Sequence, residues 1–253
     1  MAQRSVRLNT ARNLRNAPER EVWECSFSTV APDSEAILTV FKPGSLEEVN
    51  TSLPPDQAAE KCFLAMSELP DLGIPTPMVL GHAAVDGQAA VLCKKVERME
   101  WAFGTRIAAA RILSRLHNLQ ESRLSKRLQG LARLSDPREY RTTGGQAPRP
   151  EVKTLVHGDY FSANILPVAG GLRVIDWETF GWGDPMWDLG FLIGADRDLP
   201  EDEVDAVIAE YERDVPVNRE HLMWHKRRWS DFWEERKRQA SNKPDAGDAL
   251  QRA

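Results

Sequence analysis

Alternating apolar and polar side chains mark the first third of the chain. This alternation over residues 21–30 and an apolar run over residues 36–41 predict two strands. Residues 54–69 begin with two prolines, which favour a helix start. Apolar side chains then recur at helical spacing, at Ala59, Cys62, Phe63 and Met66. Two further apolar runs flank a turn at residues 85–88, so this part is predicted to be a small α+β lobe.

Helical periodicity dominates the rest of the chain. Residues 101–119 and the strongly acidic residues 201–214 are predicted to be helices, and Pro185 is placed in the first turn of another. Residues 219–239 form a further predicted helix with one apolar face, made of Leu222, Trp229, Phe232 and Trp233.

The predicted domains are an N-terminal lobe over residues 1–97 and a C-terminal lobe over residues 98–240. From about residue 241 the composition is polar, so residues 241–253 are predicted to be a disordered tail.

Composition narrows the classes of partner. The net charge of −5 argues against nucleic-acid binding, which would need a basic surface. No apolar run reaches membrane-spanning length, and the first residues lack the apolar core of a signal peptide. The three cysteines form no CxxC pair, which argues against a zinc ribbon or a disulfide framework. We therefore expect a cytoplasmic protein that binds neither nucleic acid nor membranes.

The candidate chemistry lies in residues 155–176. Asp159 and Asn164 stand in the segment LVHGDYFSANIL, and Asp176 ends the apolar run LRVI. Residues 165–174 can close a hairpin around Ala169-Gly170-Gly171, which would bring Asn164 close to Asp176. Oxygen donors from these two residues beside the carboxylate of Asp159 would form a site for a hard cation next to a potential base.

The order of these residues is typical of phosphoryl-transfer enzymes of the protein-kinase type. Those enzymes place an Asp and an Asn five positions apart on one loop and a second metal-binding Asp on the next hairpin. Asp159, Asn164 and Asp176 fit this order. The same pattern needs a strand lysine and a helix glutamate, and Lys42 and Glu60 stand in the corresponding order on the predicted strand and helix.

The motifs HGDYFSAN, VIDWE and GDPMWDL, together with EKCFLAMSELPDLGIPTPMVLG and ILSRLHNL, resemble those of the aminoglycoside phosphotransferase family, relatives of choline and fructosamine kinases. The resemblance covers roughly residues 20–120 and 150–195 and implies a bilobal, protein-kinase-like α+β fold that uses ATP and Mg²⁺. It implies these roles: Asp159 as the base that orients the substrate hydroxyl, Asn164 and Asp176 as Mg²⁺ ligands, Lys42 as a contact to the ATP phosphates, Glu60 as the partner that orients Lys42, and Lys94, Lys95 and Val96 as the hinge that binds adenine.

One segment departs from this family. Between its first two strands the family has a glycine-containing phosphate loop, whereas residues 10–21 contain no glycine. Side chains such as Asn13, Arg15 or Asn16 are candidates to replace its backbone donors.

Several neighbouring polar residues are expected to support the site. His157 is expected to brace the catalytic loop, Asp184 to cap a helix and Asp188 to brace a loop. Glu178 is placed either near a second metal ion or facing solvent.

The proposed activity is a small-molecule kinase that phosphorylates a hydroxyl group. The acidic helix 201–214 would suit an amine-bearing acceptor, although a solvated helix face is the preferred explanation. The main alternative is a kinase-fold binding module without turnover. A metal-dependent hydrolase using His157 and Asp159 would need further histidines, and His221 and His225, four positions apart, lie far away in sequence. A protein kinase is disfavoured because no activation loop follows Asp176. The oligomeric state is not predicted.

Overall fold

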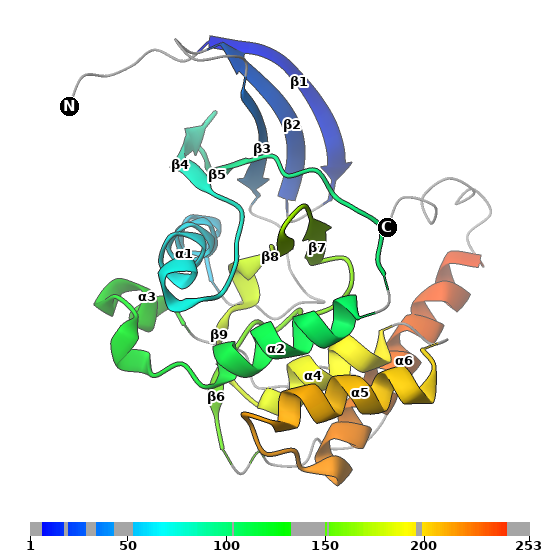
Figure 1. The fold of residues 1–253 in the computed structure, drawn as a ribbon. Coiled ribbons are helices and arrows are strands. Elements are labelled where there is room, and N and C mark those ends of the chain that lie inside the picture. Colours follow the sequence, from blue (N-terminus) through cyan, green and yellow to red (C-terminus); the bar gives the residue numbers. More distant parts are fainter. Residues whose placement is uncertain are drawn as a thin grey trace.

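The protein folds into a β-rich N-terminal lobe and a mostly helical C-terminal lobe, which form the upper and lower parts of Figure 1. The computed structural model describes residues 7–17, 20–28, 34–42, 53–102, 104–132, 150, 152–195 and 199–241. The predicted α+β class with two lobes is therefore present. The predicted tail lies outside the described residues, except for Ser241, where the last helix ends.

Five antiparallel strands form the sheet of the N-terminal lobe, in the spatial order β1-β2-β3-β5-β4. They are β1 (Arg7–Asn16), β2 (Arg20–Ser28), β3 (Ser34–Phe41), β4 (Val79–Val85) and β5 (Gln88–Lys94). The β4–β5 turn has positive φ at both central residues, 50° at Asp86 and 77° at Gly87, as a two-residue type I′ hairpin requires. Helix α1 (Pro55–Glu68) starts at its proline and packs against β3, β4 and β5. The predicted helix and the predicted 85–88 hairpin are confirmed.

Strand β1 is an element that the sequence did not reveal. All of its side chains from Asn9 to Asn16 are exposed, and β1 is an edge strand that pairs only with β2. Its side chains make polar cross-strand contacts instead, between Thr10 and Ser26 (2.8 Å) and between Arg12 and Glu24. A strand without a buried face shows no apolar alternation, so the periodicity that predicts strands is missing here.

The C-terminal lobe is built around one fully buried helix. The lobe contains α2 (Thr105–His117), α3 (Lys126–Leu131), α4 (Pro185–Gly194), α5 (Glu201–Glu212) and α6 (Arg219–Ser241), and α4 is the buried helix. All ten residues of α4 are buried, as expected of a helix that is apolar on every side. It contacts α2, α5 and α6. Two short antiparallel pairs complete the lobe, β6 (Thr154–Val156) with β9 (Gly181–Gly183) and β7 (Ile165–Val168) with β8 (Gly171–Val174).

A continuous hydrophobic core joins the two lobes. One cluster of buried side chains includes Phe41 and Val91 of the sheet, Met66 of α1 and Leu113 of α2. The backbone adds a link, since Val174 N donates to Pro75 O at 2.8 Å. Helix α1 therefore packs against both the sheet and the C-terminal lobe, and it fixes the position of each relative to the other.

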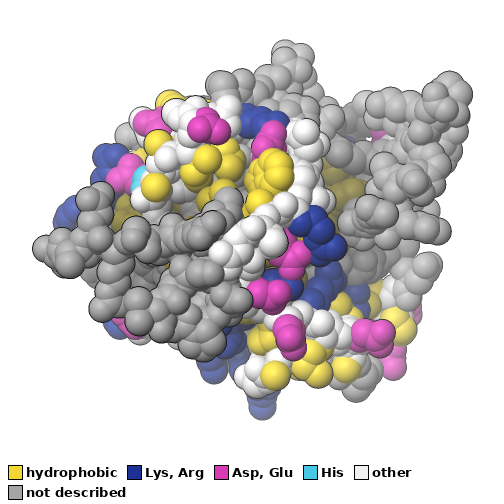
Figure 2. All heavy atoms as spheres, turned by 90° about the horizontal axis from the view of Figure 1, so that it is seen from above, with side chains coloured by type: hydrophobic (Ala, Val, Ile, Leu, Met, Phe, Trp, Pro, Cys, Tyr) yellow, Lys and Arg dark blue, Asp and Glu magenta, His cyan; other side chains and the backbone are white. Residues whose placement is uncertain are grey.

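Charges of both signs share the described surface above the sheet. Figure 2 shows acidic and basic side chains next to one another on this face, with hydrophobic side chains between them. Ion pairs within the sheet include Arg12–Glu24 and Lys95–Glu35. Among the helices that the structure describes, none combines the length and apolar character needed to cross a membrane.

The crossing of α4 and α6 provides a test of the packing. A Cβ at Gly190 would lie 2.5 Å from His225 Cβ and 3.1 Å from Lys226 N, so Gly190→Ala should force the two helices apart. We expect a loss of about 1–3 kcal/mol in the free energy of unfolding, measured in urea. Gly130→Ala is the matched control, because nothing lies within 4 Å of its added Cβ in α3 and alanine favours helix by up to about 1 kcal/mol. Equal effects of the two variants would contradict this packing.

Candidate active site

The loop that carries Asp159 is fixed through its backbone. His157 N–H and Gly158 N–H donate to the carboxylate of Asp188, at 2.6 and 2.9 Å. Thr179 Oγ1 donates to His157 O at 2.7 Å, and Trp187 Nε1 donates to Gly158 O at 2.8 Å. The φ of +87° at Gly158 is a conformation that favours glycine. Every backbone polar group of these two residues therefore has a partner, as buried peptide groups require.

The ring of His157 braces the same loop. Its Nδ1 accepts a hydrogen bond from Asp159 N at 3.2 Å, so its Nε2 carries the proton that is donated to Ile175 O at 2.8 Å. Burial lowers the pKa of His157, which favours this neutral form. Both ring nitrogens are engaged in the structure. The predicted bracing role of His157 is confirmed.

The predicted structural roles of two aspartates are also confirmed. Asp184 Oδ1 accepts from Met186 N at 2.9 Å and caps the start of α4. Asp188 lies under the catalytic loop, and its Oδ2 is 3.3 Å from His117 Nε2. The other nitrogen of His117 is 2.6 Å from the hydroxyl of Tyr211. His117, the last residue of α2, therefore connects Asp188 to α5.

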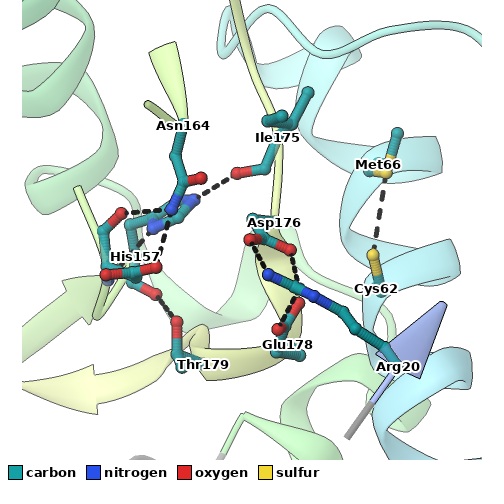
Figure 3. A network of polar contacts seen from close by, with 10 residues as sticks. Arg20, Cys62, Met66, His157, Asn164, Ile175, Asp176, Glu178 and Thr179 are labelled. Atoms are coloured by element: carbon teal, nitrogen blue, oxygen red, sulfur yellow. Dashed lines mark hydrogen bonds and ion pairs between the residues drawn. The ribbon is translucent and has the colours of Figure 1, made fainter. Parts of the chain in front are cut away.

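Asn164 holds the side chain of Asp159. Its amide Nδ2 donates to Asp159 Oδ2 at 2.7 Å and to Asp159 O at 2.9 Å. Ile175 N donates to Asn164 O at 3.0 Å, so the β7–β8 hairpin places Asn164 beside the residue that precedes Asp176. The predicted closeness of these three polar residues is confirmed, because Asp176 also lies near enough to Asp159 for its charge to raise the pKa of Asp159. Figure 3 shows Asn164 and Asp176 on neighbouring segments.

Arg20 is a residue of the site that the sequence analysis missed. It opens β2 in the N-terminal lobe, yet its guanidinium forks onto both oxygens of Asp176 and also contacts Glu178 Oε1. The contact between Arg20 Nη2 and Asp176 Oδ2 is 2.6 Å. Its position in the glycine-free segment 10–21 was the available signal, but only the fold shows that the start of β2 lies beside Asp176.

Burial and mutual repulsion shift the pKa values of the three carboxyl groups. Burial, with the charge of Asp176, raises the pKa of Asp159 to about 7. Burial also raises the pKa of Glu178, although Arg20 opposes this. Burial would raise the pKa of Asp176 too, but the guanidinium of Arg20 outweighs it and lowers that pKa. Asp176 is therefore the carboxylate that most firmly keeps its negative charge.

The donor set suits a hard cation. The carboxylates of Asp176 and Glu178 and the side-chain oxygen Oδ1 of Asn164 offer only oxygen ligands, which Mg²⁺ prefers. Glu178 Oε2 is buried without a hydrogen-bond partner, and 12% of its side chain is exposed. Of the two placements expected for Glu178, the solvent-facing one is wrong. The residues present fit a magnesium ion next to Asp159.

Lys42 and Glu60 have partners other than each other. Lys42 Nζ lies 2.7 Å from Asn16 Oδ1 and 2.7 Å from Glu21 Oε1. Glu60 accepts a forked pair of hydrogen bonds from Arg127 of α3, at 2.7 and 2.5 Å. The expected ion pair between Lys42 and Glu60 is replaced by these contacts because Glu60 lies on the side of α1 that faces α3.

The next residue on α1 faces the site instead. Lys61 is 0% exposed, and its Nζ donates to Phe180 O at 2.8 Å. Burial lowers the pKa of Lys61 to about 7, although the charge of Glu178 opposes this. Successive helical residues point about 100° apart, so a shift of one position exchanges the acidic side chain for a basic one. The apolar periodicity of α1 did not show which of the two residues, Glu60 or Lys61, faces the site.

The three expected hinge residues lie at the end of β5 and directly after it. Lys94 N donates to Met78 O at 2.8 Å, and Lys95 N donates to Glu35 O at 3.1 Å. The backbone donors of these two residues are thus used within the N-terminal lobe. Val96 begins the extended segment that leads to α2. A contact of these residues with adenine stays a prediction.

Comparison with known proteins agrees with this geometry. Residues 101–229 match the model of the phosphotransferase enzyme family. This match spans half of the chain and includes Asp159, Asn164, Asp176, Asp184 and Asp188. No curated protein matches the chain.

Solved structures with the same fold have low sequence identity to this chain. A spectinomycin phosphotransferase in complex with ADP and spectinomycin is 11% identical, with a TM-score of 0.64, over 97% of this chain and 87% of the other. A type VIII aminoglycoside-3'-phosphotransferase is 18% identical, with a TM-score of 0.59, over 85% and 92%. A fructosamine-3-kinase from Haemophilus somnus is 13% identical, with a TM-score of 0.59, over 94% and 88%. The predicted kinase-like fold is confirmed.

The burial of Lys61 gives a test through pH. Its pKa is about 7 in the folded chain and about 10.4 when exposed to solvent in the unfolded chain. Between these values the unfolded chain binds more protons at this group, so Lys61 contributes stability that rises with pH from about 7 to about 10. The free energy of unfolding of the wild type should therefore rise relative to that of Lys61→Met, by at most about 1.4 kcal/mol per pH unit in this window. The measurement is urea unfolding of both proteins at several pH values. A difference that stays constant or falls with pH would contradict a depressed pKa of Lys61.

Proposed function

The chain belongs to the phosphotransferase enzyme family, and we propose that it transfers the γ-phosphoryl group of ATP to a hydroxyl group of a small molecule. The observation that carries this proposal is the half-buried Asp159, held by Asn164 and near Asp176. A base on a fixed loop beside an oxygen-rich cation site is the arrangement that phosphoryl transfer needs.

Asp159 is the proposed catalytic residue. Its carboxylate accepts the hydrogen of the acceptor hydroxyl, which aligns the hydroxyl oxygen toward the γ-phosphorus. Asn164 restricts the orientation of the carboxylate through a 2.7 Å hydrogen bond. A pKa raised to about 7 by burial suits a group that accepts a proton near neutral pH.

Asp176, Asn164 and Glu178 would hold Mg²⁺. The bound ion would supply positive charge against the phosphate oxygens during transfer. The positive φ of 74° at Asp176 turns its carboxylate at the end of the hairpin, a backbone conformation that aspartate tolerates better than most residues.

Arg20 and Lys42 are the proposed side-chain contacts to the phosphates. Arg20 is the stronger of the two because it is buried beside Asp176, where a charge is less screened by water. It stands in the glycine-free segment 10–21, so its guanidinium would take over the role of the backbone N–H groups. Lys94, Lys95 and Val96 are proposed as the adenine hinge, with residues 1–97 and 98–240 as the lobes on either side.

The acceptor is proposed to be a small hydroxyl-bearing molecule. The acidic helix α5 gives little support for an amine group on the acceptor, because two carboxylates of α5 already have basic partners. Glu203 pairs with Arg106 at 3.1 Å and Glu210 with Arg111 at 2.6 Å, both across the contact between α5 and α2. An amine-bearing acceptor is retained only because the similar structures include enzymes named for aminoglycosides.

Replacement of the base tests the proposed function. Asp159→Asn should lower kcat by about 10²–10⁴-fold, because the amide cannot accept the hydroxyl proton. ATP binding should persist. Turnover is measured as acceptor-dependent ADP release with a panel of aminoglycosides and hydroxyl-bearing metabolites. Asp71→Asn, on an exposed 3₁₀ turn, is the matched control and should keep full activity. Undiminished turnover by Asp159→Asn would contradict the assignment.

A further inference from the structure

A second group of metal-ligating side chains lies away from the candidate active site. His221 and His225 are one turn apart on α6, which places them on the same side of the helix. Asp184 faces them from the N-cap position of α4. The three residues are buried, with exposures of 5%, 0% and 3% for His221, His225 and Asp184. Neither the catalytic loop nor the cation site described above uses the two histidines.

The ligand atoms of this group converge. Asp184 Oδ2 is 3.0 Å from His221 Nε2 and 2.9 Å from His225 Nε2, and all three atoms lie within 4.8 Å of one another. We propose that Asp184, His221 and His225 form a structural site for Zn²⁺ or a similar transition-metal ion. Two imidazoles and one carboxylate are ligands that such ions favour over Mg²⁺ or Ca²⁺.

The two distances from Asp184 to the histidines require only a small adjustment to admit a metal ion. With zinc bonds of about 2.0–2.2 Å in tetrahedral geometry, neighbouring ligand atoms lie roughly 3.3 Å apart. The observed separations are a few tenths of an ångström shorter. Rotation of the two rings by a small angle would supply the difference. A water molecule would complete the fourth position.

The surroundings hold the ligands in place. The other oxygen of Asp184 accepts from Met186 N at 2.9 Å, the kind of second hydrogen bond that orients a ligating carboxylate. Trp187 and Trp224 pack edge-on against the ring of His225. His225 Nδ1 is buried and has no hydrogen-bond partner.

A metal ion here would fasten α6 to α4. Helix α4 also carries Asp188, which holds the backbone of His157 and Gly158. The site would thus stabilise the scaffold of the catalytic loop without taking part in phosphoryl transfer. Its expected effect is on thermal stability, and it is independent of whether the proposed activity is correct.

The deciding experiment uses the untagged full chain. After removal of bound metal with a chelator, titration with Co²⁺ should give the visible absorption bands of a tetrahedral N/O site, saturating at one equivalent. Zn²⁺ should displace the cobalt and raise Tm. Absence of these bands together with no change in Tm would overturn the proposal and leave a hydrogen-bonded His–Asp–His group. This spectrum decides the question in the wild-type protein, so it does not depend on the folding of any variant.

Variants assign the ligands. His221→Gln should weaken metal binding by at least about tenfold, while His82→Gln, an exposed residue on β4, should leave the cobalt spectrum unchanged. Equal loss in both variants would contradict the assigned ligands. Circular dichroism checks that each variant is folded.

Discussion

Three carboxyl groups share the space between the lobes, and their repulsion governs how the chain is arranged around them. Asp159, Asp176 and Glu178 come from the C-terminal lobe, whereas Arg20, the guanidinium that neutralises part of their charge, comes from the N-terminal sheet. A buried ion pair of this kind is costly to break, because each partner would be left charged without water. The position of β2 above the catalytic loop is therefore tied to the charge balance of the site.

The scaffold beneath this group leaves the loop little freedom. Asp188 binds two backbone N–H groups of the loop from below, and His117 and Tyr211 extend this network to α2 and α5. The carboxylate can be placed there because α4 is buried on all sides. Hydrophobic packing thus positions α4, α4 positions Asp188, and Asp188 positions the loop that bears Asp159. The chemistry depends on a sequence of contacts that begins in the core.

Much of this arrangement could be predicted from the sequence, because it depends on local patterns. The spacing of Asp159, Asn164 and Asp176 and the hairpin between the last two follow from neighbouring residues and turn chemistry. Contacts between distant segments could not be predicted in the same way. Arg20 meets Asp176 across 156 positions of the chain, and the phase that turns Lys61 rather than Glu60 toward the site depends on how α1 packs. Strand β1 could not be predicted either, because its side chains from Asn9 to Asn16 are exposed and therefore show no apolar alternation.

The central claim is that Arg20, rather than the strand lysine, is the main positive charge for the nucleotide. Titration calorimetry with ATP and Mg²⁺ on Arg20→Gln and Lys42→Gln, two matched removals of one positive charge, tests it most directly. Our account predicts that Arg20→Gln raises the Kd for ATP by about 10–100-fold, the value of a buried charge-assisted contact. Lys42→Gln should raise it by no more than about fivefold, as for a more exposed and screened charge. A larger loss in Lys42→Gln than in Arg20→Gln, with both variants folded, would contradict the account.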